Sequence, residues 1–188
     1  MSAQPPSEPR IDLGAPCDLH ADGLLLRPWE LADAPVLLTL ADDELLATWN
    51  GHIIKSTLAD AEEKVTTSRE WVEYAVWAIV DPNSGAVLGD IALHHLNAAN
   101  SSAQFGYSVF SHARGQGVAP RAMAAVCNFA FNTLELERLE LFHAVENTQS
   151  CRAATKAGFM LEGTLRKSYR YGDGELHDEH IHSRLRTD

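Results

Sequence analysis

Long apolar runs are missing from this chain of 188 residues. No stretch approaches the roughly 20 apolar residues that a membrane-spanning helix requires. The first residues, which include Pro5, Pro6 and Glu8, also lack the basic start and apolar centre of a signal peptide. We therefore expect a cytoplasmic protein with no membrane partner.

Cysteine is scarce, with only Cys17, Cys127 and Cys151 present. Their odd number does not suit a complete disulfide framework, and their wide spacing matches no zinc motif. We therefore expect reduced thiols and no bound metal. The tail carries Asp178, His180 and His182 on what would be one face of a strand. Without a second ligand cluster elsewhere, an exposed strand face is favoured over a metal site.

Basic residues are outnumbered, because 15 Lys and Arg stand against 26 Asp and Glu, which gives a formal net charge of −11. Nucleic-acid binding needs clustered cations, so we expect no nucleic-acid partner. The negative charge suits a cationic substrate. An acidic balance that only keeps the protein soluble explains it equally well.

The most informative segment is the turn over residues 114–120, which joins an apolar strand over residues 105–110 to a periodic helix. Gly115 and Gly117 let the backbone turn tightly, so that N–H groups at the start of the helix can converge on an anion. Pro120 suits the first helical turn. The turn lacks the Lys-Ser/Thr pair of a Walker loop and the third glycine of a dinucleotide-binding loop. It predicts a phosphate site of another kind.

Four segments together resemble the GCN5-related N-acetyltransferase (GNAT) superfamily and, within it, the Rim type. They are residues 24–28 with Asp33 and Ala34 behind them, residues 105–107 leading into 114–119, residues 145–150, and residues 158–163. They occur in the family's order over nearly the whole chain. The resemblance implies an α/β (α+β) GNAT fold, a mixed splayed sheet of about seven strands flanked by about four helices.

Turn residues and apolar periodicity predict where the elements lie. Residues 1–20, rich in Pro, Ser and Asp, are expected to be a mobile arm, and residues 21–188 a single domain. The expected strands are residues 24–27, 76–80, 87–94, 105–110, 138–145, 160–171 and 175–185, and the expected helices are residues 34–41, 57–74, 118–134 and 149–157. Trp49 is expected in a loop between the first two helices.

The resemblance also implies acetyl-CoA as co-substrate, lodged between the family's fourth and fifth strands, with no metal. By family position, the residues that bind it are Tyr107, Val109, Arg114, Gly115, Gln116, Gly117, Val118, Ala119 and Asn147. The turn would bind the pyrophosphate. The backbone N–H near Val109 would stabilise the negative charge that develops when an amine attacks the thioester.

Ser150 is the candidate acid that protonates the departing thiolate. Many relatives use a Tyr four residues before the Gly158-Phe159 pair, but Ala154 stands there in this chain. The Rim type instead uses a Ser three residues after an Asn, which Asn147 and Ser150 match. A Ser just before a helix is often simply an N-cap, so that interpretation stays open.

The base is less well defined. Tyr169 stands where some Rim enzymes carry a Glu, and tyrosine is a poor base at neutral pH. His95, its neighbour His94, and Glu140 are candidates by their expected places near the cleft. A lone strand histidine more often has a structural or surface role. A chain of water molecules could also remove the proton.

The acceptor is a primary amine, either of a protein or peptide N-terminus or of a small molecule. Specificity is expected to lie in loops such as residues 50–57, with Trp29 and Trp49 as candidate pocket walls. Rim relatives are often dimers, so the resemblance allows a homodimer. A non-catalytic acyl-CoA-binding module is the alternative function, because the usual Tyr is missing and the base is open.

Overall fold

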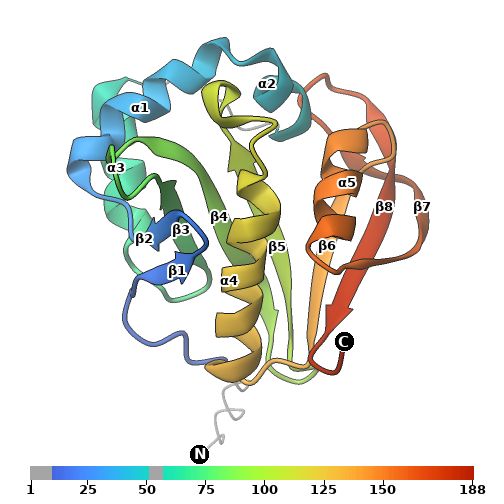
Figure 1. Ribbon diagram of the computed structural model, residues 1–188. Helices are drawn as coiled ribbons and strands as arrows, with labels where there is room; N and C mark the ends of the chain where they lie inside the picture. The colour runs from blue at the N-terminus through green and yellow to red at the C-terminus, as the bar shows by residue number, and fades with distance from the viewer. Residues whose placement is uncertain (1–9, 51–56) are drawn as a thin grey trace, which may run out of the picture.

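One mixed β-sheet runs through the chain (Figure 1). The computed structural model describes residues 10–50 and 57–188, and in this part eight strands lie in the order β1-β2-β3-β4-β5-β6-β8-β7. The strands are β1 (Leu19–Ala21), β2 (Leu24–Arg27), β3 (Ala75–Val80), β4 (Val87–Asn97), β5 (Ser102–Val109), β6 (Arg138–Ala144), β7 (Met160–Arg170) and β8 (Leu176–Leu185). The expected mixed sheet is confirmed, with β1 in addition.

Five α-helices flank this sheet in the described residues. They are α1 (Ala34–Leu38), α2 (Glu44–Asn50), α3 (Leu58–Ser68), α4 (Val118–Asn132) and α5 (Thr148–Lys156). The helix α4 crosses one face of the sheet, and α5 lies on the same side over β6 and β7 (Figure 1). None of the described helices is long and apolar enough to cross a membrane.

The strands β5 and β6 form a parallel pair, while the other neighbouring strands run antiparallel. Their pairing starts at Ser102 and Arg138 and ends at Phe105 and Leu141. Each strand continues beyond that point, β5 to Val109 and β6 to Ala144. The far ends of the two strands are therefore separated, which is the splay that the resemblance implied.

Two hydrophobic layers hold the sheet, one on each face. Along β3, Trp77 and Ile79 pack in one cluster with Met123 of α4, whereas Ala78 and Val80 pack in the other with Val65 of α3. This alternation follows from the two-residue period of a strand. All six side chains are at most 3% exposed, so the sheet is covered on both faces next to the splayed strands.

The expected mobile arm over residues 1–20 needs correction in its second half. Residues 10–20 belong to the described part, and Leu13 within them is only 3% exposed. The backbone carbonyl of Cys17 accepts a hydrogen bond of 2.9 Å from the indole N–H of Trp77. Because Leu19 already starts β1, the packed structure begins well before residue 21.

The region between the first strand pair and β3 also differs from expectation. Trp49 belongs to α2 rather than to a loop. The helix expected to run to residue 74 ends at Ser68, and Trp71 then packs against Trp77 with ring centroids 4.6 Å apart. Thr57 caps α3 as expected, accepting from the Asp60 N–H at 3.3 Å. The loop over residues 50–57 is expected to govern acceptor specificity. Its residues 51–56 lie outside the described residues.

Gly89 allows β4 to approach β5 directly beside the splayed strand end. A Cβ atom at this position would lie 2.1 Å from the carbonyl oxygen of Ser108. We predict that Gly89→Ala lowers the free energy of unfolding by at least about 2 kcal/mol, because the backbone cannot yield without breaking the strand pair. Urea titration measures this loss.

Gly163→Ala is the matched control, because Gly163 also lies in a strand and a Cβ there would meet nothing within 4 Å. Equal stabilities for the two alanine variants would contradict the close approach at Gly89.

Candidate active site

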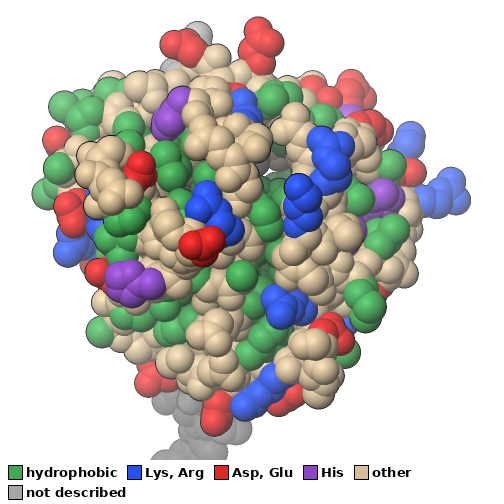
Figure 2. Space-filling model, in the orientation of Figure 1, with side chains coloured by type: hydrophobic (Ala, Val, Ile, Leu, Met, Phe, Trp, Pro, Cys, Tyr) green, Lys and Arg blue, Asp and Glu red, His purple; other side chains and the backbone are tan. Residues whose placement is uncertain are grey.

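A cavity of about 820 Å³ opens where β5 and β6 separate. Its walls are the far ends of these strands, the turn before α4, the first two turns of α5, and α2. Figure 2 shows the surface hollowed between α4 and α5, with Lys and Arg side chains beside the hollow. The splay of the sheet thus creates a cleft for a ligand.

The glycine turn forms one end of the cavity. Gly115 and Gly117 have φ angles of 77° and 71°, which side chains rarely adopt, and α4 begins at the next residue, Val118. The first amides of a helix have no acceptor within the helix, and Gly117 provides no side-chain cap. The N–H groups of Val118 and Ala119 therefore stand at a helix N-terminus that lines the cavity and suits an anion.

Two polar side chains of the turn are hydrogen-bonded to other groups of the protein. Arg114 donates from Nε to the Val109 carbonyl at 3.0 Å and from its terminal nitrogen to the Asp43 carboxylate at 2.5 Å. Gln116 does not line the cavity, and its amide nitrogen donates to the His112 carbonyl at 2.9 Å. Arg114 thereby joins the end of β5 to the start of α2, which Asp43 also caps through the Leu46 N–H at 3.2 Å.

The backbone of Val109 faces the gap between the separated strands. The N–H of the next residue, Phe110, donates to the Leu88 carbonyl on the β4 side at 2.9 Å. Successive residues of a strand direct their amides to opposite edges, so the N–H of Val109 points away from β4. Its carbonyl is the group that Arg114 holds, which agrees with this direction.

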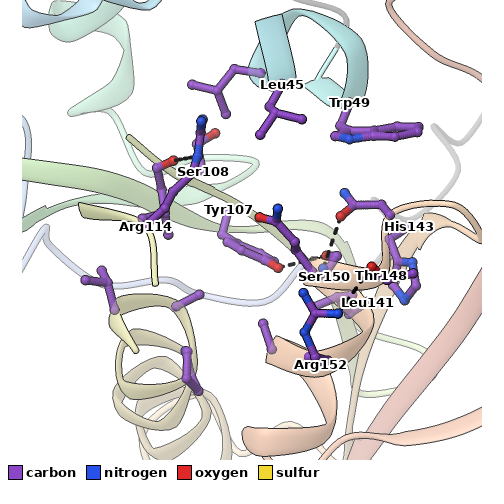
Figure 3. A pocket seen from close by; sticks show the side chains of 18 of the residues that line it. Leu45, Trp49, Tyr107, Ser108, Arg114, Leu141, His143, Thr148, Ser150 and Arg152 are labelled. Carbon is purple, nitrogen blue, oxygen red and sulfur yellow. Dashed lines mark hydrogen bonds between the residues drawn. The ribbon is translucent and has the colours of Figure 1, made fainter. Parts of the chain in front are cut away.

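Two hydroxyl groups meet across the cleft. Tyr107 of β5 and Ser150 of α5 share a hydrogen bond of 2.8 Å (Figure 3). Ser150 is 7% exposed and lies in the first turn of α5. Burial raises the pKa of Tyr107, and the bond to Ser150 only partly opposes that rise, so Tyr107 carries its proton at neutral pH.

The N-cap interpretation of Ser150 is wrong, because Asn147 caps α5. The Asn147 side-chain oxygen accepts a hydrogen bond of 3.1 Å from the backbone N–H of Ser150. The cap leaves the Ser150 hydroxyl free to meet Tyr107. Asn147 itself also lines the cavity.

The candidate bases His94, His95 and Glu140 do not line this cleft. His95, with a φ of 48°, lies where the pairing of β4 with β5 is interrupted between His94 and Asn97. Its Nδ1 lies 2.6 Å from that of His94, and neither ring lines the cavity. Glu140 accepts a hydrogen bond of 2.8 Å from Arg138 and does not line the cavity either. Of these candidates for catalysis and Ser150, only Ser150 lies in the cleft.

Cationic side chains on α5 line the cavity and were not anticipated. Arg152 and Lys156 both belong to its wall, and they stand four residues apart, which places them on one helix face. That spacing was the signal in the sequence. Together with the α4 N-terminus they make this end of the cavity suitable for a polyanion.

The opposite end is aromatic and acidic. Trp49 of α2 lines the cavity (Figure 3). It meets Tyr171, which also lines the cavity, with ring centroids 5.7 Å apart. The Tyr171 hydroxyl donates to the Glu179 carboxylate at 2.9 Å. Glu146, also in the wall, lies 3.3 Å from His177. Trp29, expected here, is instead buried in the core between α1 and α3.

His177 lies between two carboxylates at this end. Its Nε2 is 2.9 Å from Asp173 and its Nδ1 is 3.3 Å from Glu146. The hydrogen bond with Asp173, and then that with Glu146, raise the pKa of His177. The local charge therefore suits a cationic group entering from solvent.

Comparison with known proteins agrees with this geometry. Residues 23–160 match the family described as acetyltransferase (GNAT) domain. The "Putative ribosomal N-acetyltransferase YdaF" of Bacillus subtilis is 33% identical over 104 residues, 55% of this chain and 56% of the relative. The ribosomal-protein-serine acetyltransferase of Escherichia coli is 28% identical over 99 residues, 53% and 55% of the two chains. These matches span about half the length of both relatives.

A solved structure shares the fold over most of the chain. It is Mycobacterium smegmatis RimJ in complex with CoA-disulfide, at a TM-score of 0.78 and 24% identity, covering 90% of this chain and 86% of that one. The expected GNAT fold is confirmed by this likeness, and the Rim-type resemblance by the names of the relatives. The family match covers well over half of the sequence, and the chain belongs to the GNAT family of N-acetyltransferases.

Proposed function

We propose that this protein transfers the acetyl group of acetyl-CoA directly to the primary amine at the N-terminus of a protein or peptide. The observation that carries the proposal is the cleft between the separated strands, in which Tyr107 and Ser150 share a hydrogen bond beside an uncapped helix N-terminus. A relative named for acetylating a ribosomal-protein serine supports this class of acceptor.

The anionic part of acetyl-CoA fits the cationic end of the cavity. The Val118 and Ala119 amides at the start of α4 suit its diphosphate, and Arg152 and Lys156 add positive charge on the facing helix. Arg114 contributes through the backbone of the turn, because its side chain is engaged by Asp43. The acyl chain would then run toward the Val109 N–H and the hydroxyl pair.

The reaction joins the amine nitrogen to the thioester carbonyl carbon and breaks the bond from that carbon to sulfur. Negative charge develops on the carbonyl oxygen, and the Val109 N–H, which faces the gap, is positioned to stabilise it. The departing thiolate takes a proton from Ser150 while the bonded Tyr107 hydroxyl passes its own proton to the serine oxygen, so no free alkoxide forms. Solvent then returns a proton to Tyr107.

The attacking amine must be neutral, so a base has to remove the proton of its ammonium form. Neither His95 nor Glu140 lines the cavity. Glu146 does, at the aromatic end. We assign the proton to Glu146, received directly or through water, and the acidic surroundings attract the charged acceptor.

Replacing the hydroxyl of Ser150 tests the acid. We expect Ser150→Ala to lower kcat about 100-fold, the lower range for loss of general acid catalysis, with the KM for acetyl-CoA unchanged. Tyr107→Phe should lower kcat less, because Ser150 keeps its own proton. Steady-state kinetics with thiol detection measures both.

Ser168→Ala is the control, since this exposed serine bonds to the Leu165 carbonyl on β7, away from the cavity. A Ser150→Ala enzyme that turns over as fast as Ser168→Ala would refute the assignment of the acid.

Gly117 tests the phosphate site. We expect Gly117→Val to reduce CoA affinity at least tenfold in isothermal calorimetry, because valine strongly disfavours the φ of 71° that starts α4. Gly85→Val matches it, since Gly85 has a φ of 74° in the turn before β4 and does not line the cavity. If both variants lose CoA affinity equally, general backbone strain and not the turn is responsible.

A peptide panel tests the acceptor. We expect acetyl-CoA to be consumed with a peptide that begins with serine, and mass spectrometry to find one acetyl group on its α-amine. The same peptide with a blocked N-terminus should be inert. Turnover with small amines such as spermidine but with no peptide would exclude the proposed acceptor class while leaving the acetyltransferase activity intact.

A further inference from the structure

Four side chains gather beneath α5, apart from the reacting groups described above. They are His143, Cys151, His180 and His182, and one ligand atom from each lies within 4.8 Å of those of the other three. His182 is 1% exposed and His143 is 3% exposed. The cluster is formed by two neighbouring strands and the helix that covers them.

The register of the sheet explains the meeting of the histidines. His143 on β6 pairs directly with His180 on β8, and His182 follows two residues later on the same face. The rings of His143 and His182 stack, with centroids 5.1 Å apart. The helix α5 passes over this face and brings Cys151.

Several ring nitrogens in the cluster have no hydrogen-bond partner in the described part of the chain. They are Nε2 of His143, Nδ1 of His180, and both nitrogens of His182, all buried. The backbone of Phe159 lies near His182 but does not meet hydrogen-bond geometry with its ring. Leaving a buried polar atom unpaired costs about 1–3 kcal/mol. A bound group that pairs with these nitrogens would therefore stabilise the folded protein.

One histidine is already oriented as a ligand. His143 Nδ1 lies 2.7 Å from the carbonyl of Ala144, so the ring donates there and leaves the lone pair on Nε2. Metal-binding histidines are commonly held by such a bond from the other nitrogen.

We propose that His143, Cys151, His180 and His182 bind one divalent transition-metal ion, with zinc as the natural occupant. Three imidazoles and one thiolate supply the ligand types and the four-coordination that zinc takes in proteins. Zinc bonds of about 2.0 to 2.3 Å place tetrahedral ligands about 3.5 Å apart, so the set needs to contract by about 1 Å. Asp178 lies outside it and accepts from the Lys167 N–H at 2.8 Å.

Four protein ligands leave no open position for a substrate, so this metal acts by holding structure. It joins α5 to β6 and β8 at Cys151, the residue after Ser150. The ion would therefore hold the first turn of α5 while taking no part in acetyl transfer.

Cobalt titration of the full-length chain, prepared without a polyhistidine tag, reduced and freed of metal by a chelator, tests the site. We expect one Co²⁺ per chain, with the intense visible bands of tetrahedral cobalt and a thiolate charge-transfer band, all displaced by Zn²⁺. Zinc should also raise the Tm of the protein, because it binds only the folded chain.

Variants identify the ligands. Cys151→Ala should lose the charge-transfer band, and both Cys151→Ala and His180→Gln should weaken cobalt binding at least tenfold. Cys17→Ser and His20→Gln are matched controls outside the cluster and should bind as the original chain does. The double variant Cys17→Ser, Cys127→Ala keeps Cys151 as the single thiol, and its charge-transfer band should persist.

Absence of a tetrahedral cobalt spectrum in the original chain would overturn the proposal, as would full retention of that spectrum in Cys151→Ala. If Cys151→Ala does not fold, as judged by circular dichroism, the double variant decides: loss of its charge-transfer band refutes the site. None of these readouts depends on acetyl transfer, so failure here leaves the proposed enzyme activity untouched.

Discussion

The site depends on the ending of one set of backbone hydrogen bonds. β5 and β6 pair only as far as Phe105 and Leu141, and both strands then continue without each other. Unpaired strand edges are costly unless other groups meet them. Here β5 is held on β4, which Gly89 lets approach Ser108, and Arg114 takes up the Val109 carbonyl. The remaining edge faces the cavity, where a ligand can use it.

The separation of β5 from β6 also determines which side chains can meet in the cleft. Because β5 diverges from β6, Tyr107 reaches across to α5 and meets Ser150 at 2.8 Å. The position that carries a tyrosine in many relatives is occupied by Ala154, which is fully buried. A hydroxyl from the strand and a hydroxyl from the first helical turn thus occupy the cleft together. The strand β5 thus holds both the Ser150 hydroxyl, through Tyr107, and the backbone N–H group of Val109.

Features with a local cause could be predicted from the sequence, and those that depend on register could not. The glycine turn before α4 and the Thr57 cap are encoded within a few residues, and both are present. β1 and α2 are three and seven residues long, too short to give a clear period. The Tyr107–Ser150 bond and the meeting of His143 with His180 require knowing which strands lie side by side. Spacing in the tail alone therefore favoured an exposed strand face.

The proposed acid, Ser150, lies in the first turn of a nine-residue helix. Helices this short are marginal by themselves, and their ends open most easily. Asn147 fixes the backbone of that turn through its cap, and Tyr107 fixes the hydroxyl. A metal ion would anchor Cys151, the residue after Ser150, to β6 and β8. The turn would then be held by Asn147, by Tyr107 and by the ion. In this proposal the histidine cluster supports the Ser150 hydroxyl, which would otherwise lie at a fraying helix end.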